Sequence, residues 1–342
     1  MPREYSIPRI AIVGASSLLG KELKQFIEEE NLPVADIALL DTSLPAGTLS
    51  EAAGEPTFLK PMDRESFDGV RFVFFCGSAQ EAKNNWKLAE AAGATIIDLT
   101  GALEDAGAAP WIPGLDTLLA PPEAKAGRPY HRGIYSSPAP PVMIACRLAA
   151  ALSEFSPSRL VILFFPPASE HGQPGIDELE KQAADLLLLR SIPQVVFDAQ
   201  VAFNLLASYG DASRPAISDM RGEICKRIAA YLCARLPLPA VQLIQAPVFY
   251  GYAFAAYADL PLSVDLAAVD AALFAAGMHL VGKSDAKPTN VSVAGEAKIH
   301  IAHAEHDAGV GSGVWLWGAA DNLRLAAANA MRIAEELLAP KV

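Results

Sequence analysis

The feature that most constrains this chain is a strand, a glycine turn and a helix at its start. The run RIAIVGA (9–15) is rich in Ile and Val and suits a strand buried on both faces. The segment SSLLGKELKQFIEEENL (16–32) follows with the apolar period of a helix and with its charges facing outward. A strand that passes through a glycine turn into a helix predicts a βαβ unit, and therefore a parallel sheet.

The same alternation continues to about residue 138. Further strands are expected at VADIALLD (34–41), VRFVFFCG (70–77) and TIIDLTG (95–101), with a helix at SAQEAKNNWKLAEAAGA (78–94). We therefore expect residues 1–138 to form a Rossmann-type, doubly wound α/β domain. Its ligand should lie at the carboxyl ends of the strands.

The pattern changes after a helix expected near 141–154. Strands then follow one another with only one further short helix expected, VDLAAVDAALFAAG (264–277). The expected elements are a strand at 158–168, a helix at 175–188, and strands within 240–260, 290–295 and 297–306. This order predicts an α+β domain over 139–320 with a mixed, mostly antiparallel sheet. The C-terminal helix, 321–342, is expected to pack back on the first domain.

Composition excludes several classes of function. The 342 residues suit two domains, and 52% hydrophobic with 19% charged residues is typical of a globular protein. A net charge of −12 without a Lys/Arg cluster argues against a nucleic-acid or membrane partner. We expect the start of the sequence to be a first strand rather than a signal peptide, and no apolar stretch reaches membrane-spanning length, so a cytoplasmic protein is expected.

No metal site is expected. The four cysteines, Cys76, Cys146, Cys225 and Cys233, lack metal-ligand spacing and are expected to be small buried residues. His300, His303 and His306 invite a metal interpretation, but side chains three apart on a strand point to opposite faces. Trp315 and Trp317, two apart, should share one face and pack there.

The glycine loop GASSLLG has two interpretations. It places Gly14 after the first strand and Ser16, Ser17 and Leu18 at the start of the helix, where backbone N–H groups suit a pyrophosphate. The other interpretation is a tight turn between strand and helix. Asp41, at the end of the second expected strand, is the acidic residue that favours a free ribose 2′-hydroxyl, hence NAD over NADP.

Motifs along the whole chain resemble those of the aspartate-semialdehyde dehydrogenase family. The loop resembles G-A-[ST]-G-x-[VL]-G with Ser17 for the middle glycine, where a Cβ would crowd a bound phosphate. Further matches are TIIDLTGAL to I-D-x-S-S-A-F, ASEHGQPGIDEL to S-G-A-G-x-x-G-I-x-E-L, VAFNLLA to x-A-F-N-x-x-P, APVFYG to V-P-V-x-x-G, and VWLWGAADNLRLAAANAMRIAE to the closing strand and helix. They occur in family order.

The resemblance implies a reaction that this chain lacks the residues to perform. The family, which serves amino-acid biosynthesis, reduces an acyl phosphate to an aldehyde with NADPH through a cysteine thioester, a histidine and an orienting glutamine. Two arginines hold the carboxylate and the phosphate. The N-P-N-C-[ST]-T turn falls on Ser136–Pro141, which puts Ala139 at the nucleophile. Cys146 is no substitute, because it should lie about 10 Å along the following helix.

The other four family positions are also changed. The orienting glutamine falls at Pro166, the carboxylate-binding arginine at Gln245, the histidine at Tyr252 and the phosphate-binding arginine at Glu104. Gln cannot replace the bidentate charged grip of a guanidinium, and Glu repels a phosphate. The family arginine for the 2′-phosphate of NADP falls at Leu44, which again favours NAD.

A different polar site remains an alternative. Glu170 and His171 occupy positions that border the family's substrate pocket, and with Ser136, Ser137, Glu104 and Tyr252 they could form a hydrolytic site. The competing interpretation is a polar lining without a reaction. A His171 farther than about 4 Å from every hydroxyl would remove the base.

The sequence therefore predicts a member of this family that is inactive in the family reaction, similar to the Usg-type paralogues that lack its catalytic residues. Its expected role is binding or regulation, as a homodimer or with an active paralogue, with NAD(P) as the possible cofactor. The alternative is an enzyme with altered chemistry in the same cleft, such as an NAD(P)-dependent oxidoreductase acting on an aldehyde or oxo group.

Overall fold

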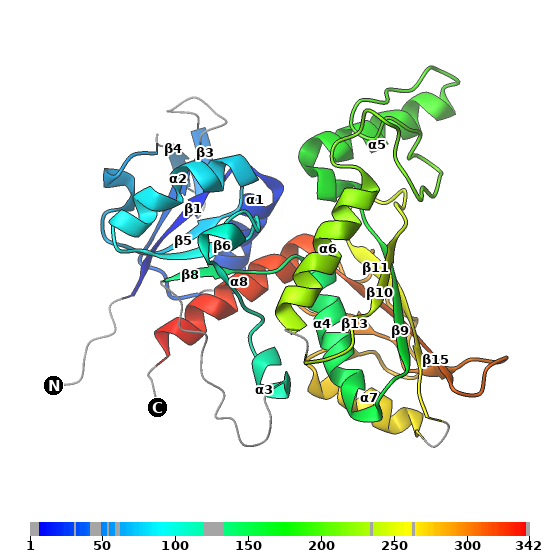
Figure 1. Ribbon diagram of the computed structural model, residues 1–342. Coiled ribbons are helices and arrows are strands. Elements are labelled where there is room, and N and C mark those ends of the chain that lie inside the picture. The colour runs from blue at the N-terminus through cyan, green and yellow to red at the C-terminus, as the bar shows by residue number, and fades with distance from the viewer. Residues whose placement is uncertain are drawn as a thin grey trace. The chain divides into compact units, whose positions relative to one another are not determined.

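The computed structural model describes residues 7–30, 32–41, 49–52, 55–58, 62–119, 133–232, 235–261 and 264–339. The chain divides into two compact units (Figure 1). Unit 1 comprises residues 1–113, 124–139 and 326–342, and unit 2 comprises residues 114–123 and 140–325. Each unit is described by itself.

Unit 1 is built on a parallel sheet. Its strands are β1 (Arg9–Val13), β2 (Asp36–Leu40), β5 (Val70–Phe75), β6 (Thr95–Asp98), β7 (Ala109–Pro110) and β8 (Ile134–Ser136), in the order β2-β1-β5-β6-β8-β7. All their described pairings are parallel. A separate hairpin joins β3 (Leu49–Ala52) and β4 (Glu55–Phe58). The predicted Rossmann-type sheet is confirmed.

Helices α1 (Leu18–Glu29) and α2 (Ala79–Ala91) follow β1 and β5, as the alternation predicted. Both begin at a serine: Ser17 accepts a hydrogen bond from Gly20 N–H, and Ser78 accepts one from Glu81 N–H. Short 3-10 turns, η1 (Glu65–Phe67) and η2 (Glu104–Ala106), complete the connections. β1 and the end of β5 are buried, as a strand covered on both faces requires.

Unit 2 has a mixed sheet. Its strands are β9 (Arg159–Phe165), β10 (Ala240–Leu243), β11 (Tyr252–Asp259), β12 (His279–Leu280), β13 (His300–Ile301), β14 (Glu305–His306) and β15 (Gly313–Ala320). The order is β10-β9-β11-β15-β13-β12, with β14 paired to β15. The long strands β9, β11 and β15 pair antiparallel, whereas β10 and β12 join parallel. The predicted mixed, mostly antiparallel sheet is confirmed.

The two faces of this sheet differ in burial. Along β9 and β11 residues alternate strictly, with Leu160, Ile162 and Phe164 buried and their neighbours partly exposed. Helix α4 (Pro140–Leu152) contacts β9, α6 (Ile217–Leu232) and α7 (Leu266–Ala275), and Figure 1 shows these helices along one side of the sheet. The partly exposed positions therefore form the opposite face. The remaining elements are α3 (Leu115–Leu119), η3 (Ser153–Phe155), η4 (Ala168–His171), α5 (Gly172–Leu187) and α8 (Asn322–Leu338).

Two expectations for unit 2 are wrong. The expectation of a single further helix missed α6, although its buried Ile217, Ile224 and Ile228 follow a helical spacing. The segment NVSVAG (290–295) is not a strand. Thr289 and Ser292 bond each other's backbone N–H groups, which closes a local turn, and Gly295 has φ +79°.

Helix α8 passes from unit 2 into unit 1. Its Asn329 donates hydrogen bonds to the carbonyl of Trp111 (3.2 Å) and to Ser137 Oγ (2.8 Å), both in unit 1. The end of the chain is thus fixed to the first sheet by polar contacts as well as by its buried alanines. Within the described ranges, no helix is both long enough and apolar enough to cross a bilayer.

Replacing Gly14 by Ala should destabilise the protein by about 3 kcal/mol or more. Gly14 has φ +78°, and an added Cβ would lie 2.3 Å from Gly77 Cα. The energy of the strained backbone and the energy of the steric overlap therefore both contribute to the loss of stability. The matched control is Gly69→Ala, at φ +70° but facing open space, which should cost only about 1–2 kcal/mol. Denaturant unfolding of both variants measures the difference, and equal losses would contradict the packing role of Gly14.

Candidate functional site

The glycine loop of unit 1 is held by short backbone contacts. Gly14 N–H and Ala15 N–H both donate to the carbonyl of Leu40, at 2.9 and 3.2 Å, which joins the end of β1 to the end of β2. Ser17 N–H donates to the Gly14 carbonyl at 3.0 Å. The loop is therefore the tight turn of one interpretation, and it also places the start of α1 at the carboxyl end of the sheet.

Two predicted residues fix this loop with their side chains. Ser17 Oγ accepts from Gly20 N–H and donates to the carbonyl of Cys76, both at 2.9 Å. The hydroxyl at the family's glycine position is thus bonded inside the fold. Asp41, 4% exposed, accepts from Ser16 N–H at 2.9 Å through Oδ2. Its carboxylate therefore lies beside the loop, where the acidic residue of a dinucleotide site is found.

These residues fit a dinucleotide. The positive end of α1, with Leu18 as its first residue, suits a pyrophosphate, and the Asp41 carboxylate can accept hydrogen bonds from a ribose. Gly14, Ser16, Ser17, Leu18 and Asp41 lie together at one strand end, and their role in cofactor binding stays a prediction. Leu44, at the expected NADP position, lies outside the described residues.

The predicted active-site turn follows β8. Ser136 and Ser137 are buried, and Ala139 lies directly before α4. Ser137 N–H donates to the Asp98 carbonyl, and Ser137 Oγ accepts from Asn329. The Asp98 side chain accepts hydrogen bonds from Thr100 and Leu103, and η2 begins at Glu104. Ala139 has no atom that can attack a carbonyl.

In unit 2, the Gln245 side chain is hydrogen-bonded to other groups of the same chain. Its side chain is fully buried, and Nε2 donates to the carbonyls of Pro166 (3.0 Å) and Ala246 (2.8 Å). Oε1 accepts from the Tyr209 hydroxyl at 2.6 Å. The position that the resemblance assigns to a carboxylate-binding arginine therefore holds a neutral amide bonded to its own chain, and Pro166, at the glutamine position, supplies one of the acceptors.

This amide also decides the proton on His171. Because Gln245 Oε1 takes the Tyr209 hydrogen, the His171 Nε2 atom, 3.1 Å from the Tyr209 oxygen, must carry a hydrogen and donate it. Burial lowers the pKa of His171 to about 4, so the ring is neutral at pH 7. Phe197 and Tyr209 pack against the ring at centroid distances of 4.8 and 5.3 Å.

The distance criterion for a His171 base is met, but the direction of the hydrogen bond is wrong for activation. A general base accepts the proton of its nucleophile, whereas His171 donates to Tyr209. Burial, and next the charge of Glu170, raise the pKa of Tyr209. The pair is therefore a structural link and not a base with its nucleophile.

Glu170 and Tyr252 face each other beside this link. Glu170 Oε1 accepts from Asn322 Nδ2 at 3.0 Å, and burial raises the pKa of its carboxyl group. Burial, and next the Glu170 charge, raise the pKa of Tyr252 well above its ordinary value. The fully buried Tyr252 hydroxyl lies near Glu170 without a well-formed hydrogen bond to it or to any other described group. A protonated phenol cannot act as the family's histidine base.

Sequence reasoning missed Tyr209 and Asn322, which hold this region together. Asn322 Nδ2 also donates to Ser169 Oγ, and its Oδ1 accepts from Gly251 N–H at 3.0 Å. Asn322 could have been found from the sequence, because it lies in the closing strand-and-helix motif, where α8 begins. Tyr209 lies in a long connection without periodicity, so nothing in the sequence marked it. The predicted residues of unit 2, Pro166, Glu170, His171, Gln245 and Tyr252, form one neighbourhood, whereas Glu104, Ser136, Ser137 and Ala139 belong to unit 1.

The other candidate residues have packing roles. His303 Nδ1 lies 2.6 Å from Asp270, and His300 packs on His279 at 4.5 Å. In the part of the chain that the structure describes, no group of three His, Cys, Asp or Glu side chains is placed to hold a metal ion. Trp315 and Trp317 pack on Tyr257 and Phe165. Burial raises the pKa of Cys146 to about 12, so it is not a thiolate.

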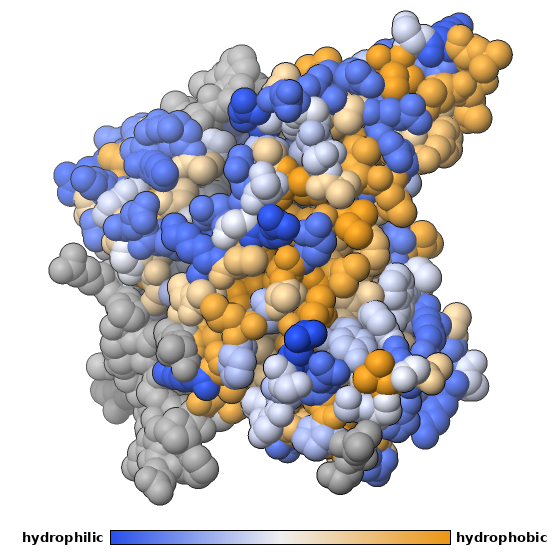
Figure 2. Space-filling view, turned by 45° about the vertical axis from the view of Figure 1, so that its right-hand side comes forward, coloured by the Kyte–Doolittle hydropathy of each residue, from blue (hydrophilic) through white to orange (hydrophobic). Residues whose placement is uncertain are grey.

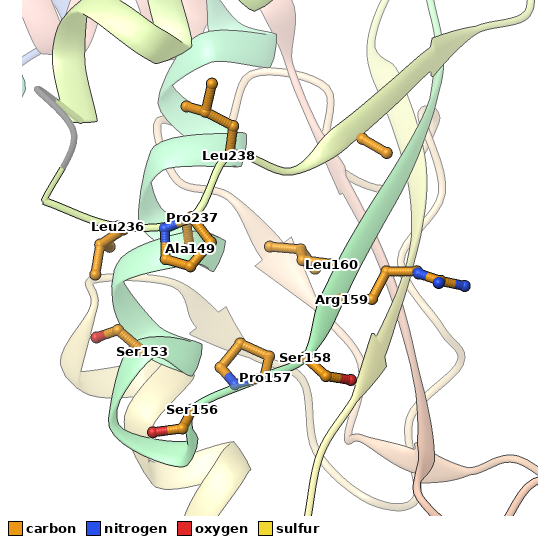
Figure 3. A pocket seen from close by; sticks show the side chains of 11 residues that line it. Ala149, Ser153, Ser156, Pro157, Ser158, Arg159, Leu160, Leu236, Pro237 and Leu238 are labelled. Carbon is orange, nitrogen blue, oxygen red and sulfur yellow. The ribbon is translucent and has the colours of Figure 1, made fainter.

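A cavity of about 410 Å³ lies elsewhere in unit 2 (Figure 3). It is bounded by the end of α4, the start of β9 and the segment before β10, with Ala149, Leu160 and Pro237 among its lining residues. Figure 3 shows the Arg159 side chain pointing away from these apolar groups. None of the predicted site residues lines this cavity.

The His171 ring should make stability depend on pH. Its pKa is about 4 in the folded chain against 6.5 ordinarily, so the unfolded state binds more protons between these values. The contribution is complete above pH 6.5 and falls by up to about 3 kcal/mol as pH drops to 4. The raised pKa of Glu170 acts in the opposite sense, which makes a variant comparison necessary.

The comparison is with His171→Gln, which keeps an N–H donor for Tyr209 but does not titrate. Denaturant unfolding at pH 7, 5.5 and 4 should show a steeper loss for the wild type than for the variant. Parallel curves would contradict a buried neutral His171.

Comparisons with known proteins agree with this architecture. A family model described as "Semialdehyde dehydrogenase, NAD binding domain" matches residues 9–125, and one described as "Semialdehyde dehydrogenase, dimerisation domain" matches residues 148–325. The "USG-1 protein homolog" of Pseudomonas aeruginosa is 31% identical over 333 residues, covering 96% of this chain and 97% of the relative. The aspartate-semialdehyde dehydrogenase of Rickettsia bellii is 25% identical, covering 99% of each chain.

Solved structures show the same fold. A probable aspartate-semialdehyde dehydrogenase from Pseudomonas aeruginosa has a TM-score of 0.83 at 30% identity, covering 97% of this chain and 99% of its own. The aspartate-semialdehyde dehydrogenase II of Vibrio cholerae has a TM-score of 0.82 at 23% identity, covering 97% and 98%. Since the two family models and these relatives span nearly the whole length, the chain belongs to the aspartate-semialdehyde dehydrogenase family.

Proposed function

We propose that this chain is a member of its family that does not catalyse the family reaction and acts by binding, as a regulatory homodimer. The proposal starts from Ala139, which offers no nucleophile where the resemblance places a cysteine thiolate. The family route needs a covalent bond to a side-chain sulfur at this point. Without that bond the acyl-transfer route is closed, whatever residues stand at the other four family positions.

The observation that carries the proposal is the closure of the Gln245 amide. An anion site in this neighbourhood needs donors free to meet a carboxylate, and the family uses a guanidinium. Gln245 Nε2 donates to the carbonyls of Pro166 and Ala246, and its Oε1 accepts from the Tyr209 hydroxyl. With Tyr252 kept as a protonated phenol, the neighbourhood supplies neither the arginine anchor nor the histidine base of the family.

The homodimer would use the open face of the unit 2 sheet. Phe165, Tyr257 and Trp317 lie on that face, and Trp315 is 41% exposed. An uncovered sheet face with aromatic side chains is typical of a protein interface. The family description of residues 148–325 as a dimerisation domain supports a dimer formed through this unit. An active paralogue with a similar face is the second possible partner.

The cofactor that the site favours is NAD rather than NADP. The Asp41 carboxylate, oriented by Ser16 N–H, would accept hydrogen bonds from a ribose 2′-hydroxyl but would repel a 2′-phosphate. The loop backbone and the start of α1 would hold the pyrophosphate. When bound, the nicotinamide group would supply hydride chemistry, whereas the residues described above supply binding and orientation.

The first test is an assay with aspartate semialdehyde, phosphate and either NAD or NADP. We expect no turnover by the wild type, because the family's cysteine nucleophile, histidine base and arginine anchors are all replaced. The Rickettsia bellii relative serves as the positive control. Turnover at an ordinary 1–1,000 per second would refute the proposal.

A variant with Ala139→Cys, Tyr252→His, Gln245→Arg and Glu104→Arg restores the family residue at four positions. The same assay of this variant tests whether the rest of the fold still supports the family reaction. Its folding must be checked by circular dichroism, because the arginine enters a fully buried position.

The second test titrates NADH and NADPH against the protein by fluorescence. We expect the Kd of NADH to be lower by about tenfold or more, which corresponds to about 1.4 kcal/mol. Asp41→Asn keeps an acceptor for Ser16 N–H but removes the charge, so the Kd values of NADH and NADPH should lie closer together in this variant. Asp105→Asn, at an exposed carboxylate of the same unit, is the matched control. Tighter binding of NADPH than of NADH by the wild type would contradict the role of Asp41.

A further inference from the structure

The carboxyl ends of the strands in unit 1 carry buried acidic groups. Among the residues of unit 1 that the structure describes, every buried charged side chain is acidic: Asp41 (4% exposed), Glu81 (8%) and Asp98 (fully buried). Asp41 directly follows β2, Glu81 lies in the first turn of α2, which follows β5, and Asp98 ends β6. Because these strands are parallel, the three residues lie at the same edge of the sheet as the glycine loop.

Two of these carboxylates hold loops at this edge of the sheet. Asp41 accepts a hydrogen bond from Ser16 N–H at 2.9 Å. Asp98 accepts hydrogen bonds from Thr100 N–H at 2.8 Å and from Leu103 N–H at 2.9 Å. These contacts within the chain explain why two acidic side chains are tolerated in the interior.

The third carboxylate, that of Glu81, lies directly against the glycine loop. A Cβ added to Gly77 would overlap Glu81 Oε2, and one added to Gly14 would lie 3.0 Å from the same atom. The two glycines also meet each other, since a Cβ on Gly77 would lie 3.0 Å from Gly14 Cα. The loop after β1 and the loop after β5 therefore touch at the place where the Glu81 carboxylate lies.

The acidic charges act on the residues that border the loop. Burial raises the pKa of the Cys76 thiol, and the charges of Asp98 and Glu81 raise it further. Cys76 precedes Gly77, and its carbonyl accepts a hydrogen bond from Ser17 Oγ in the glycine loop. A phosphate bound at this loop would be exposed to the same negative charges, which repel it.

The start of α2 requires a hydrogen-bonding side chain at position 81 but not a charge. Ser78 precedes the helix, and its side chain accepts a hydrogen bond from Glu81 N–H at 3.1 Å. The sequence SAQE (78–81) has the spacing of a capping box, in which Gln serves as well as Glu. Gln would therefore begin the same helix without a negative charge beside the glycine loop, so the charge itself needs another explanation.

We propose that the Glu81 carboxylate acts as a built-in anion at the glycine loop and weakens the binding of ligands that carry phosphate there. This inference rests on the dinucleotide site proposed above. The positive end of α1 attracts a pyrophosphate whereas Glu81 repels it, so the site discriminates between ligands by their charge. A nucleoside without phosphate escapes this repulsion. The wild-type chain therefore binds NAD only at a high concentration of the dinucleotide, which suits a regulatory role.

The test compares Glu81→Gln with the wild type. Gln keeps the capping box, so the midpoint of denaturant unfolding should stay the same. Fluorescence titration should give a Kd of NADH that is lower by about tenfold or more in the variant, because the repulsion of the pyrophosphate is removed. The Kd of adenosine, measured by isothermal titration calorimetry, should change by less than about twofold, since adenosine carries no phosphate.

The matched control is Glu90→Gln, which removes a carboxylate from the other end of α2. Glu90 is exposed, and Figure 2 shows mainly hydrophilic residues on the face of unit 1 at upper left. Water and salt screen a charge on such a surface. The control variant should therefore bind NADH as the wild type does.

The outcomes separate this inference from the proposed cofactor. If the wild type binds NADH and Glu81→Gln binds it no more tightly, the inference is overturned and the cofactor proposal stands. The same holds if Glu90→Gln gains as much affinity for NADH, or if Glu81→Gln gains as much for adenosine. If only Glu81→Gln binds NADH, the inference is supported and NADH is not a ligand of the wild type. If neither protein binds NADH, both proposals are overturned.

Discussion

The region around the candidate site depends on one requirement, the satisfaction of a buried amide. Gln245 is fully buried, and an unpaired amide there would cost several kcal/mol. Its partners are the carbonyls of Pro166 and Ala246 and the hydroxyl of Tyr209. That requirement fixes the Tyr209 hydroxyl, which in turn fixes the proton of His171. Residues that could have served a reaction are thereby used to complete the fold.

The glycine loop of unit 1 shows that one residue can meet a structural and a functional demand together. Gly14 is required because its neighbour Gly77 leaves no space for a Cβ. The same turn brings Asp41 to Ser16 N–H and places α1 where it can receive an anion. The glycine alone therefore does not decide between a tight turn and a phosphate loop, and the match of residues 9–125 to an NAD-binding domain favours the loop that also binds a dinucleotide.

The fold could be predicted from the sequence because both sheets follow from local patterns. Buried strands alternating with helices predicted the parallel sheet, and successive strands predicted the mixed one. Helix α6 was missed although Ile217, Ile224 and Ile228 follow a helical spacing. Residues 290–295 were wrongly expected to be a strand, because hydrogen bonds from side-chain hydroxyls to the backbone outweigh the strand preference of the valines there. Within the site, spacing located Gln245 and Tyr252. It could not locate Tyr209 or Asn322, because their contacts join segments 36 to 153 residues apart.

Polar and apolar groups are treated in opposite ways in unit 2, and this contrast bears on what the unit does. Around Gln245 and Asn322 nearly every polar group is paired within the chain, so little is left to grip a charged substrate. After α5, in contrast, Leu189 and Val195 are exposed, although Glu178 accepts hydrogen bonds from the backbone N–H groups of Val195 and Val196. A catalytic unit needs the reverse arrangement, with unsatisfied polar groups directed at the substrate and apolar groups buried. This contrast is the physical basis of the binding role that we propose for the chain.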